Sequence, residues 1–161
     1  MWVGKFTPWP GQVNVHHIIA GNVFAALHYH LDGSPCVPCV SDMRVRVKAA
    51  NEELFHYPDV MVACDPTDHA KLWRDSPILI VEVSSPETTR IDAREKNWAY
   101  QTIPSLESYV MISQTACAVT VYRRAKGWIP EMFTDSAGSL EVDCLKFALP
   151  LSRLFARTGL A

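Results

Sequence analysis

Residues 78–83 read Ile-Leu-Ile-Val-Glu-Val, an apolar run that contains one carboxylate. A short, almost continuous apolar run is typical of a strand covered on both faces, as in a mixed α/β sheet. Alternate residues of a strand share one face, so Ile80, Glu82 and Ser84 are expected to point the same way. An unpaired carboxylate in such surroundings costs several kcal/mol of folding free energy. Glu82 therefore requires a compensating partner.

Two more strands are predicted upstream of this run. Residues 59–64, Asp-Val-Met-Val-Ala-Cys, form an apolar strand that opens on Asp59, and the polar segment 65–75 connects it to the first strand. Residues 43–48 alternate between apolar and basic side chains, which predicts a strand with one apolar and one basic face. The sequence thus places two carboxylates, Asp59 and Glu82, on neighbouring strands.

Two helices are predicted around these strands. Apolar residues recur every four positions between Asn14 and Leu31, which indicates a helix that residues 32–35, Asp-Gly-Ser-Pro, terminate. A second helix is expected over residues 89–101, because the proline at position 104 disfavours a helical residue before it.

The carboxyl-terminal part of the chain is expected to add strands and a short helix. The strand-like runs are residues 108–112, 118–123 and 128–133, with a hairpin turn at 125–127, and Pro150 opens a helix that ends near Ala156. No repeat or linker interrupts the order. We therefore expect one α/β domain over residues 1–161, with a mixed central sheet flanked by helices.

Composition excludes several classes of protein. The 161 residues are 48% apolar and 20% charged, which is typical of a globular chain, and the apolar runs are too short for a membrane span. A net charge of −2 provides no overall positive field for nucleic acid. Five scattered cysteines disfavour a disulfide scaffold and favour a reducing compartment. No signal peptide is apparent, so we expect a cytoplasmic protein with no membrane partner.

The charged residues in apolar surroundings suggest a metal site. Two carboxylates on adjacent strands are ligands that Mg²⁺ prefers, and a nearby lysine can orient or deprotonate water. Lys96 lies one helical turn from both Asp92 and Tyr100, near the border of the helix that faces the sheet. An alternative stays open, in which Lys96 forms a structural ion pair with Glu82 or Asp92 and Asp59 caps a turn.

Four motifs carry a resemblance to a known family. They are Tyr57-Pro58-Asp59-Val60, the run from Ile80 to Thr88, Asp92-Ala93-Arg94-Glu95-Lys96 with Tyr100, and Glu107-Ser108-Tyr109-Val110. In this order they resemble the Uma-two family of restriction-endonuclease-like proteins, within the PD-(D/E)XK nuclease superfamily. The resemblance extends from about His16 to Leu151 and implies the restriction-endonuclease-like fold.

The resemblance also implies roles for individual residues. Asp59, Glu82 and the carbonyl of Val83 would bind one or two Mg²⁺ or Mn²⁺ ions, and Lys96 would be the catalytic lysine. The superfamily usually places that lysine two residues after the glutamate, where this chain has Ser84. His16 and Ser84 are candidate substrate contacts. Ser84 and the following serine also fit a simple turn.

The resulting hypothesis is a Mg²⁺-dependent endonuclease that hydrolyses DNA phosphodiester bonds. Two alternatives stay open: a catalytically silent nucleic-acid-binding or regulatory module of the same fold, and a structural or partner-binding homodimer. Two short basic clusters are candidate phosphate contacts, namely Arg44, Arg46 and Lys48, and Arg123, Arg124 and Lys126. A zinc site at Cys36, Cys39, His28 and His30 is disfavoured, because the two histidines lie on different faces of the predicted helix.

Overall fold

The computed structural model describes residues 11–49, 52–68, 70, 72–84 and 90–160. The elements in chain order are α1 (Gly11–His30), β1 (Val37–Val40), β2 (Arg44–Ala49), β3 (Glu52–His56), β4 (Val60–Ala63), β5 (Trp73–Arg74), β6 (Pro77–Ser84), α2 (Arg90–Gln101), β7 (Ser108–Ser113), β8 (Val119–Arg123), η1 (Arg124–Lys126), β9 (Glu131–Phe133), β10 (Ser139–Val142), η2 (Asp143–Leu145), β11 (Phe147–Pro150) and α3 (Leu151–Leu154).

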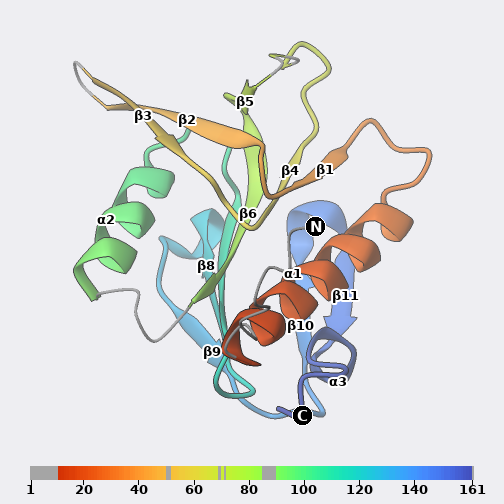
Figure 1. Ribbon diagram of the computed structural model, residues 1–161. Coiled ribbons are helices and arrows are strands. Elements are labelled where there is room, and N and C mark those ends of the chain that lie inside the picture. Colours follow the sequence, from red (N-terminus) through yellow and green to blue (C-terminus); the bar gives the residue numbers. More distant parts are fainter. Residues whose placement is uncertain (1–10, 50–51, 69, 71, 85–89, 161) are drawn as a thin grey trace, which may run out of the picture.

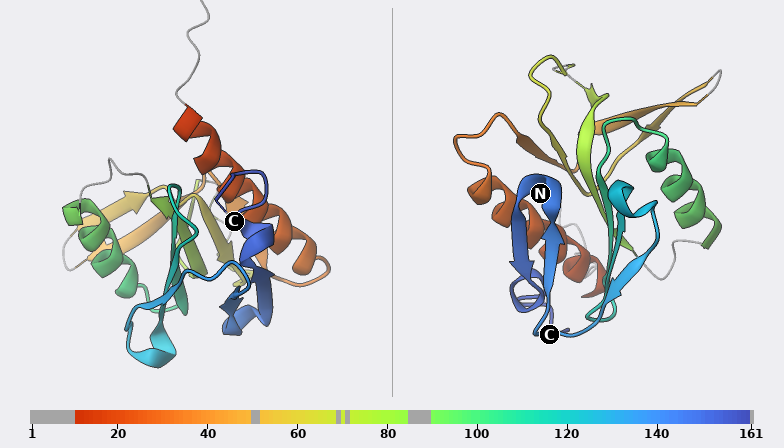
Figure 2. Two further views of the ribbon diagram at one scale, coloured as in Figure 1. Left: turned by 90° about the horizontal axis from the view of Figure 1, so that it is seen from below. Right: turned by 180° about the vertical axis from the view of Figure 1, so that it is seen from behind.

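A mixed six-stranded sheet forms the centre of the fold, with strand order β1-β4-β6-β7-β8-β9 (Figure 1). Strands β6 and β7 are parallel, and α2 provides the crossover between them. The other neighbours in this sheet are antiparallel. Helices α1 and α2 lie on opposite sides of the sheet (Figure 2).

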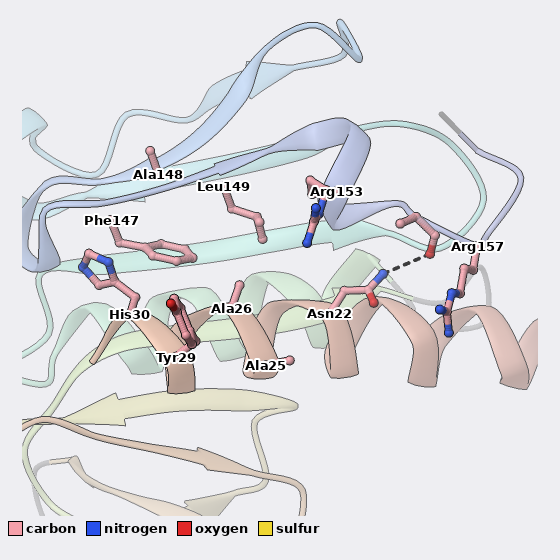
Figure 3. Close-up of a pocket in the computed structure, with 11 residues that line it drawn as sticks. Asn22, Ala25, Ala26, Tyr29, His30, Phe147, Ala148, Leu149, Arg153 and Arg157 are labelled. Atoms are coloured by element: carbon pink, nitrogen blue, oxygen red, sulfur yellow. Dashed lines mark hydrogen bonds between the residues drawn. The ribbon is translucent and has the colours of Figure 1, made fainter. Parts of the chain in front are cut away.

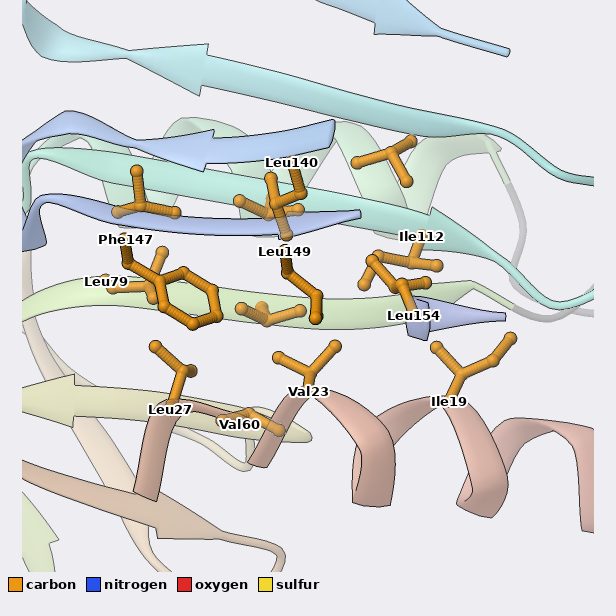
Figure 4. Packing of buried hydrophobic residues seen from close by; sticks show 14 of the residues in the cluster. Ile19, Val23, Leu27, Val60, Leu79, Ile112, Leu140, Phe147, Leu149 and Leu154 are labelled. Carbon is orange, nitrogen blue, oxygen red and sulfur yellow. The ribbon is translucent and has the colours of Figure 1, made fainter. Parts of the chain in front are cut away.

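The face of the sheet toward α1 forms the larger core. Ile19, Val23 and Leu27 of α1 are buried against alternate residues of the central strands, including Val60. The β10–β11 ribbon and α3 contribute further apolar side chains to the same cluster, among them Leu154 (Figure 4). The apolar spacing of α1 matches the helical period, and this explains why the sequence alone locates the helix.

The opposite face of the sheet packs against α2 and β2. Because successive side chains of a strand alternate between faces, Met61 and Ile80 point away from α1 and enter a second cluster with Tyr100 and Ile103 of α2. Val45 of β2 is buried in the same cluster. This second core holds α2 at a fixed depth beside β6, which matters for the site described below.

The predicted strand at 43–48 forms, but it belongs to a different sheet. β2 pairs antiparallel with β3 and parallel with the two-residue β5, in a separate sheet of order β3-β2-β5. Strands β1, β3, β5, β10 and β11 are not predicted by the sequence analysis. They are short; β1 and β5 pair with strands that are not their neighbours in the chain, whereas β2–β3 and β10–β11 pair as successive strands.

Two predicted elements near the carboxyl terminus, a strand and a helix, are longer than the elements that form. The strand expected over 128–133 retains only β9, because Gly127 and Trp128 both have positive φ, 64° and 62°, which breaks an extended run. The helix expected from Pro150 to Ala156 is confined to α3.

One disulfide is present in the described residues, although the scattered cysteines disfavour a disulfide scaffold. Cys36, just before β1, forms a disulfide with Cys64, just after β4. The paired strands β1 and β4 bring these two residues together. Because the two cysteines are 28 positions apart, local sequence patterns do not predict their pairing. Among the helices in the described ranges, none is long and apolar enough to cross a membrane.

Candidate active site

The register between β4 and β6 brings Asp59 and Glu82 to the same end of the sheet. Val60 pairs with Val81 in the antiparallel ladder, so the residue before Val60 lies across from the residue after Val81. The backbone N–H of Val83 donates a 2.7 Å hydrogen bond to Oδ2 of Asp59. The two carboxylates expected on neighbouring strands are therefore cross-strand neighbours.

Helix α2 supplies two donors to a single oxygen of Glu82. Tyr100 donates from its hydroxyl to Oε1 at 2.8 Å, and Lys96 approaches the same oxygen with Nζ at 3.4 Å. Residues four apart on a helix share a face, so both side chains reach β6 from successive turns. The structure thus brings Lys96 to Glu82, as the sequence suggests.

Glu82 is a buried acid, with a side chain only 13% exposed. Burial raises its pKa above the usual range, and the charge of Asp59 raises it further. Lys96 and the Tyr100 hydroxyl act in the opposite direction, because they stabilise the ionised form. The pKa of Tyr100 is itself raised far above its ordinary value by burial and by the adjacent carboxylate. The Glu82 carboxylate is therefore desolvated and only partly compensated by its protein neighbours.

His16 reaches the site from α1. Its Nε2 lies 3.3 Å from Oδ1 of Asp59, and this hydrogen bond is the main reason that the pKa of His16 is raised. A backbone hydrogen bond to Val83 and the charge of Glu82 raise this pKa as well. The structure therefore places His16 at the site in contact with Asp59; its role as a substrate contact stays a prediction.

Ser84 occupies the position where the superfamily usually has its lysine, and it is engaged elsewhere. Its hydroxyl donates to the carbonyl of Ile112 at 3.3 Å, which ties the end of β6 to β7. The motif residues 85–88 and the side chain of Asp92 lie outside the described part of the structure. The predicted ion pair between Asp92 and Lys96 therefore lies outside the described part of the structure.

Tyr100 is the site residue to which the sequence analysis assigned no role. Its signal was present, because it lies one helical turn from Lys96 on the same face of α2. An aromatic residue at a helix border is usually a core residue, and Tyr100 is fully buried. Only the structure shows that its hydroxyl ends on Glu82.

Half of the residues in the two basic clusters are paired with acidic side chains, namely Arg46, Arg123 and Lys126. Arg46 forms a bidentate pair with Asp75, at 2.6 and 2.8 Å, and also contacts Glu53. Arg123 and Lys126 both bind Glu131. These contacts weaken the case for the three paired residues as phosphate contacts, and Arg123 is also buried.

The donor atoms at this end of the sheet fit a hard divalent cation. Asp59 and Glu82 offer carboxylate oxygens and Val83 offers a carbonyl, which is the chemistry that Mg²⁺ and Mn²⁺ prefer. A cation would also relieve the incomplete compensation of buried Glu82. Within the described residues no group of three histidine, cysteine, aspartate or glutamate side chains forms a metal cluster, and Cys36 of the disfavoured zinc site is in a disulfide.

Comparison with known proteins identifies a matching family and similar proteins. The model of the Uma2 family, described as "Putative restriction endonuclease", matches residues 2–152. Two curated relatives are uncharacterized proteins of Synechocystis sp.; they are 32% identical over 122 residues and 28% identical over 148 residues. The matches cover 75% and 89% of this chain. They cover 63% and 82% of the relatives, so the chain spans less than two thirds of the first one.

A solved structure shares the fold. The crystal structure of a "putative nuclease belonging to DUF820" from Anabaena variabilis superposes with a TM-score of 0.73 at 14% sequence identity, covering 97% of this chain and 86% of that one. This likeness confirms the predicted α/β fold with a mixed central sheet flanked by helices.

Proposed function

Because the chain belongs to the Uma2 family of restriction-endonuclease-like proteins, we propose that it is a Mg²⁺-dependent endonuclease that hydrolyses the phosphodiester bonds of DNA. The family supports a nuclease-like function in general. The identity of the metal, the DNA substrate and the roles of the individual residues are the parts that we propose. The observation that carries it is the convergence of β4, β6 and α2 on one buried carboxylate, Glu82, with Asp59 beside it and Lys96 in contact.

Each residue at this site has a distinct role in the proposed reaction. Asp59 and Glu82, with the Val83 carbonyl, would hold one or two Mg²⁺ or Mn²⁺ ions. Tyr100 and Lys96 both bind Oε1 of Glu82 and so fix the orientation of the carboxylate. A bound cation would supply charge stabilisation at the scissile phosphate and would lower the pKa of a water molecule.

Lys96 contributes a second positive charge next to that position. Its side chain is about one quarter exposed, so the ammonium group stays partly accessible while it touches Glu82. An ammonium group there can orient a water molecule and offset phosphate charge. His16 has a different task, because its raised pKa favours the protonated ring, which balances the charge of Asp59.

A silent nucleic-acid-binding or regulatory module is the second candidate, and one observation favours it. His16, Lys96 and Tyr100 already satisfy oxygens of both carboxylates without any cation. An ion-pair network of this kind can preserve the fold without turnover. This candidate predicts DNA binding without cleavage.

Plasmid nicking with Mg²⁺ or Mn²⁺ tests the proposal. The wild type is compared with Glu82→Gln, which keeps the shape of the side chain and removes its charge, and with Glu141→Gln as a matched control. Glu141 is exposed on β10, away from the site. We expect metal-dependent nicking by the wild type and the control and none by Glu82→Gln. No cleavage by the wild type, or equal cleavage by all three proteins, overturns the proposal.

A further inference from the structure

A groove of about 960 Å³ lies between α1 and the carboxyl-terminal elements β11 and α3 (Figure 3). Its floor is apolar and includes Ala25 and Ala26 of α1 and Leu149 of β11. It extends along α1 from Asn22 to the helix end, a span of roughly 12 Å at the usual rise per residue. None of the residues proposed for catalysis lines it.

The charge of this groove has one sign. Arg153 and Arg157 form one end, and none of the described residues that line the groove is acidic. In the described part of the chain, neither guanidinium has a side-chain ion pair, whereas Arg46 and Arg123 are paired with acids. Figure 3 shows both side chains directed toward α1, across the opening. The groove therefore presents two uncompensated positive charges to an anion.

Backbone strain at Arg157 is a second, independent observation. Its φ is 68°, in the left-handed region, where a side chain costs about 1 kcal/mol and glycine is the usual residue. Residues in this region cluster at ligand-binding sites, although Lys146 shares the conformation outside the groove. Arg157 lies at the same end of the groove as Arg153 (Figure 3).

The arginine end of the groove is held in place from α1. The Nδ2 atom of Asn22 donates to the carbonyls of Leu154 and Ala156 at 2.9 and 3.0 Å. These bonds fix the turn after α3 against the helix, and the two arginines lie on either side of the bonded carbonyls. The distance between the guanidinium end and the helix is thus set by the fold.

The other end of the groove is aromatic. Phe147 packs edge-on against His30 with ring centroids 5.3 Å apart, and His30 is fixed by a 3.0 Å contact between Nε2 and the carbonyl of Leu145. Tyr29 lies beside them and is 87% exposed, so the core does not explain its presence. An aromatic ring of this kind provides a stacking surface for a planar group.

We propose that this groove binds a nucleoside phosphate, with the phosphate at Arg153 and Arg157 and the base toward the exposed ring of Tyr29. The anionic and the planar parts of such a ligand match the two ends of the groove. The same chemistry is present in a free nucleotide and in the phosphorylated end of a nucleic acid strand. The proposal is independent of nuclease activity, because the groove and the Glu82 site share no residue.

Calorimetric titration with AMP, at fixed ionic strength and without metal, tests the proposal. We expect AMP to bind at least tenfold more tightly than inorganic phosphate or adenosine alone, since each of these fills one end of the groove. Arg153→Gln and Arg157→Gly should each weaken AMP binding about tenfold, as expected for the loss of one charged hydrogen bond. Glu82→Gln should bind AMP as the wild type does.

The glycine variant separates a binding role from a structural one. Arg157→Gly relieves the left-handed backbone, so its unfolding free energy should stay equal or rise while AMP binding falls. Lys146→Gly is the matched control, because Lys146 is an exposed cation with φ of 50° outside the groove lining. Absence of AMP binding, or equal weakening by Arg157→Gly and Lys146→Gly, overturns the proposal.

A 5′-phosphorylated oligonucleotide distinguishes the two sources of the ligand. If it displaces AMP and loses affinity in Arg157→Gly, the groove holds a strand end. If AMP binds and the oligonucleotide does not displace it, the ligand is a free nucleotide. Displacement that is unchanged in Arg157→Gly contradicts the assigned phosphate position.

Discussion

Nζ of Lys96 lies 3.4 Å from Oε1 of Glu82, although 14 residues separate the two positions in sequence. The lysine reaches the carboxylate from helix α2, while Ser84, two residues after Glu82, bonds to the carbonyl of Ile112 in the neighbouring strand. A positive charge beside a strand carboxylate is thus supplied by the following helix and not by the strand itself. The charge of Lys96 can therefore be tested by a substitution in α2 that leaves the strand unchanged.

Replacing Lys96 with methionine tests whether its charge acts on the reaction. Lys96→Met keeps most of the aliphatic stem, and we expect nicking to fall by about 10²- to 10⁴-fold, the usual contribution of a positioned proton-transfer group. Mn²⁺ binding, measured by calorimetry, should be unchanged or tighter because a competing positive charge is gone. Lys146→Met serves as control. Wild-type nicking by Lys96→Met would show that the lysine is only a structural ion-pair partner.

Removing one hydroxyl tests the hydrogen bond between Tyr100 and Glu82. Tyr100→Phe should lower the free energy of unfolding by about 1.5–3 kcal/mol, because the lost bond is to a charged, buried acceptor. Urea denaturation at neutral pH measures this. Tyr29→Phe, at an 87% exposed position, should change it by no more than about 0.5 kcal/mol. Equal losses in the two variants would contradict the assigned bond.

Metal binding should be visible as a gain in thermal stability. A cation that binds only the folded protein adds about 2.7 kcal/mol at a hundredfold excess over its dissociation constant. We expect Mg²⁺ or Mn²⁺ to raise the Tm of the wild type and of Glu141→Gln, and EDTA to reverse the shift. Glu82→Gln should show no shift. The same increase in Glu82→Gln would place the cation elsewhere.

Acid sensitivity is expected at the pair of Arg46 and Asp75. The hydrogen bond from Arg46 holds the pKa of Asp75 below its usual value. A depressed folded-state pKa adds stability above the unfolded pKa, near 4, and this stability is lost as the pH falls further. Asp75→Asn should therefore cost at most about 1 kcal/mol at pH 7, given its partial exposure, and less at pH 3. Urea titrations at both pH values measure this difference. A pH-independent difference would contradict it; Asp32→Asn is the exposed control.

The disulfide between Cys36 and Cys64 should stabilise the fold. Replacing both cysteines with serine is expected to lower the free energy of unfolding by roughly 2–4 kcal/mol relative to the oxidised protein. Peptide mapping without reductant should recover the crosslinked pair. Cys144→Ser, at an exposed free cysteine, should have little effect. Failure to recover the crosslink from oxidised protein would contradict the pairing.

Local patterns in the sequence are sufficient to locate the central elements of the fold. The helical spacing of α1 and the apolar runs of β4 and β6 depend on neighbours within a few positions, and these elements form where the patterns predict. The same patterns identify Asp59 and Glu82 as charges in apolar strands. Such charges are conspicuous in the sequence, because a carboxylate that is buried loses its solvation and must be compensated.

Other features depend on contacts between distant segments and required the tertiary structure. The separate sheet that contains β2 depends on parallel pairing with the two-residue β5, which lies beyond β3 and β4 in the chain, and such a short strand has little pattern of its own. The second core decides the depth and rotation of α2, and hence that the Tyr100 hydroxyl ends on Glu82. The sequence therefore determines which residues are buried and charged, whereas packing of the helices and sheets determines which of them touch. Hydrogen bonds depend on ångström-scale distances that local periodicity does not specify.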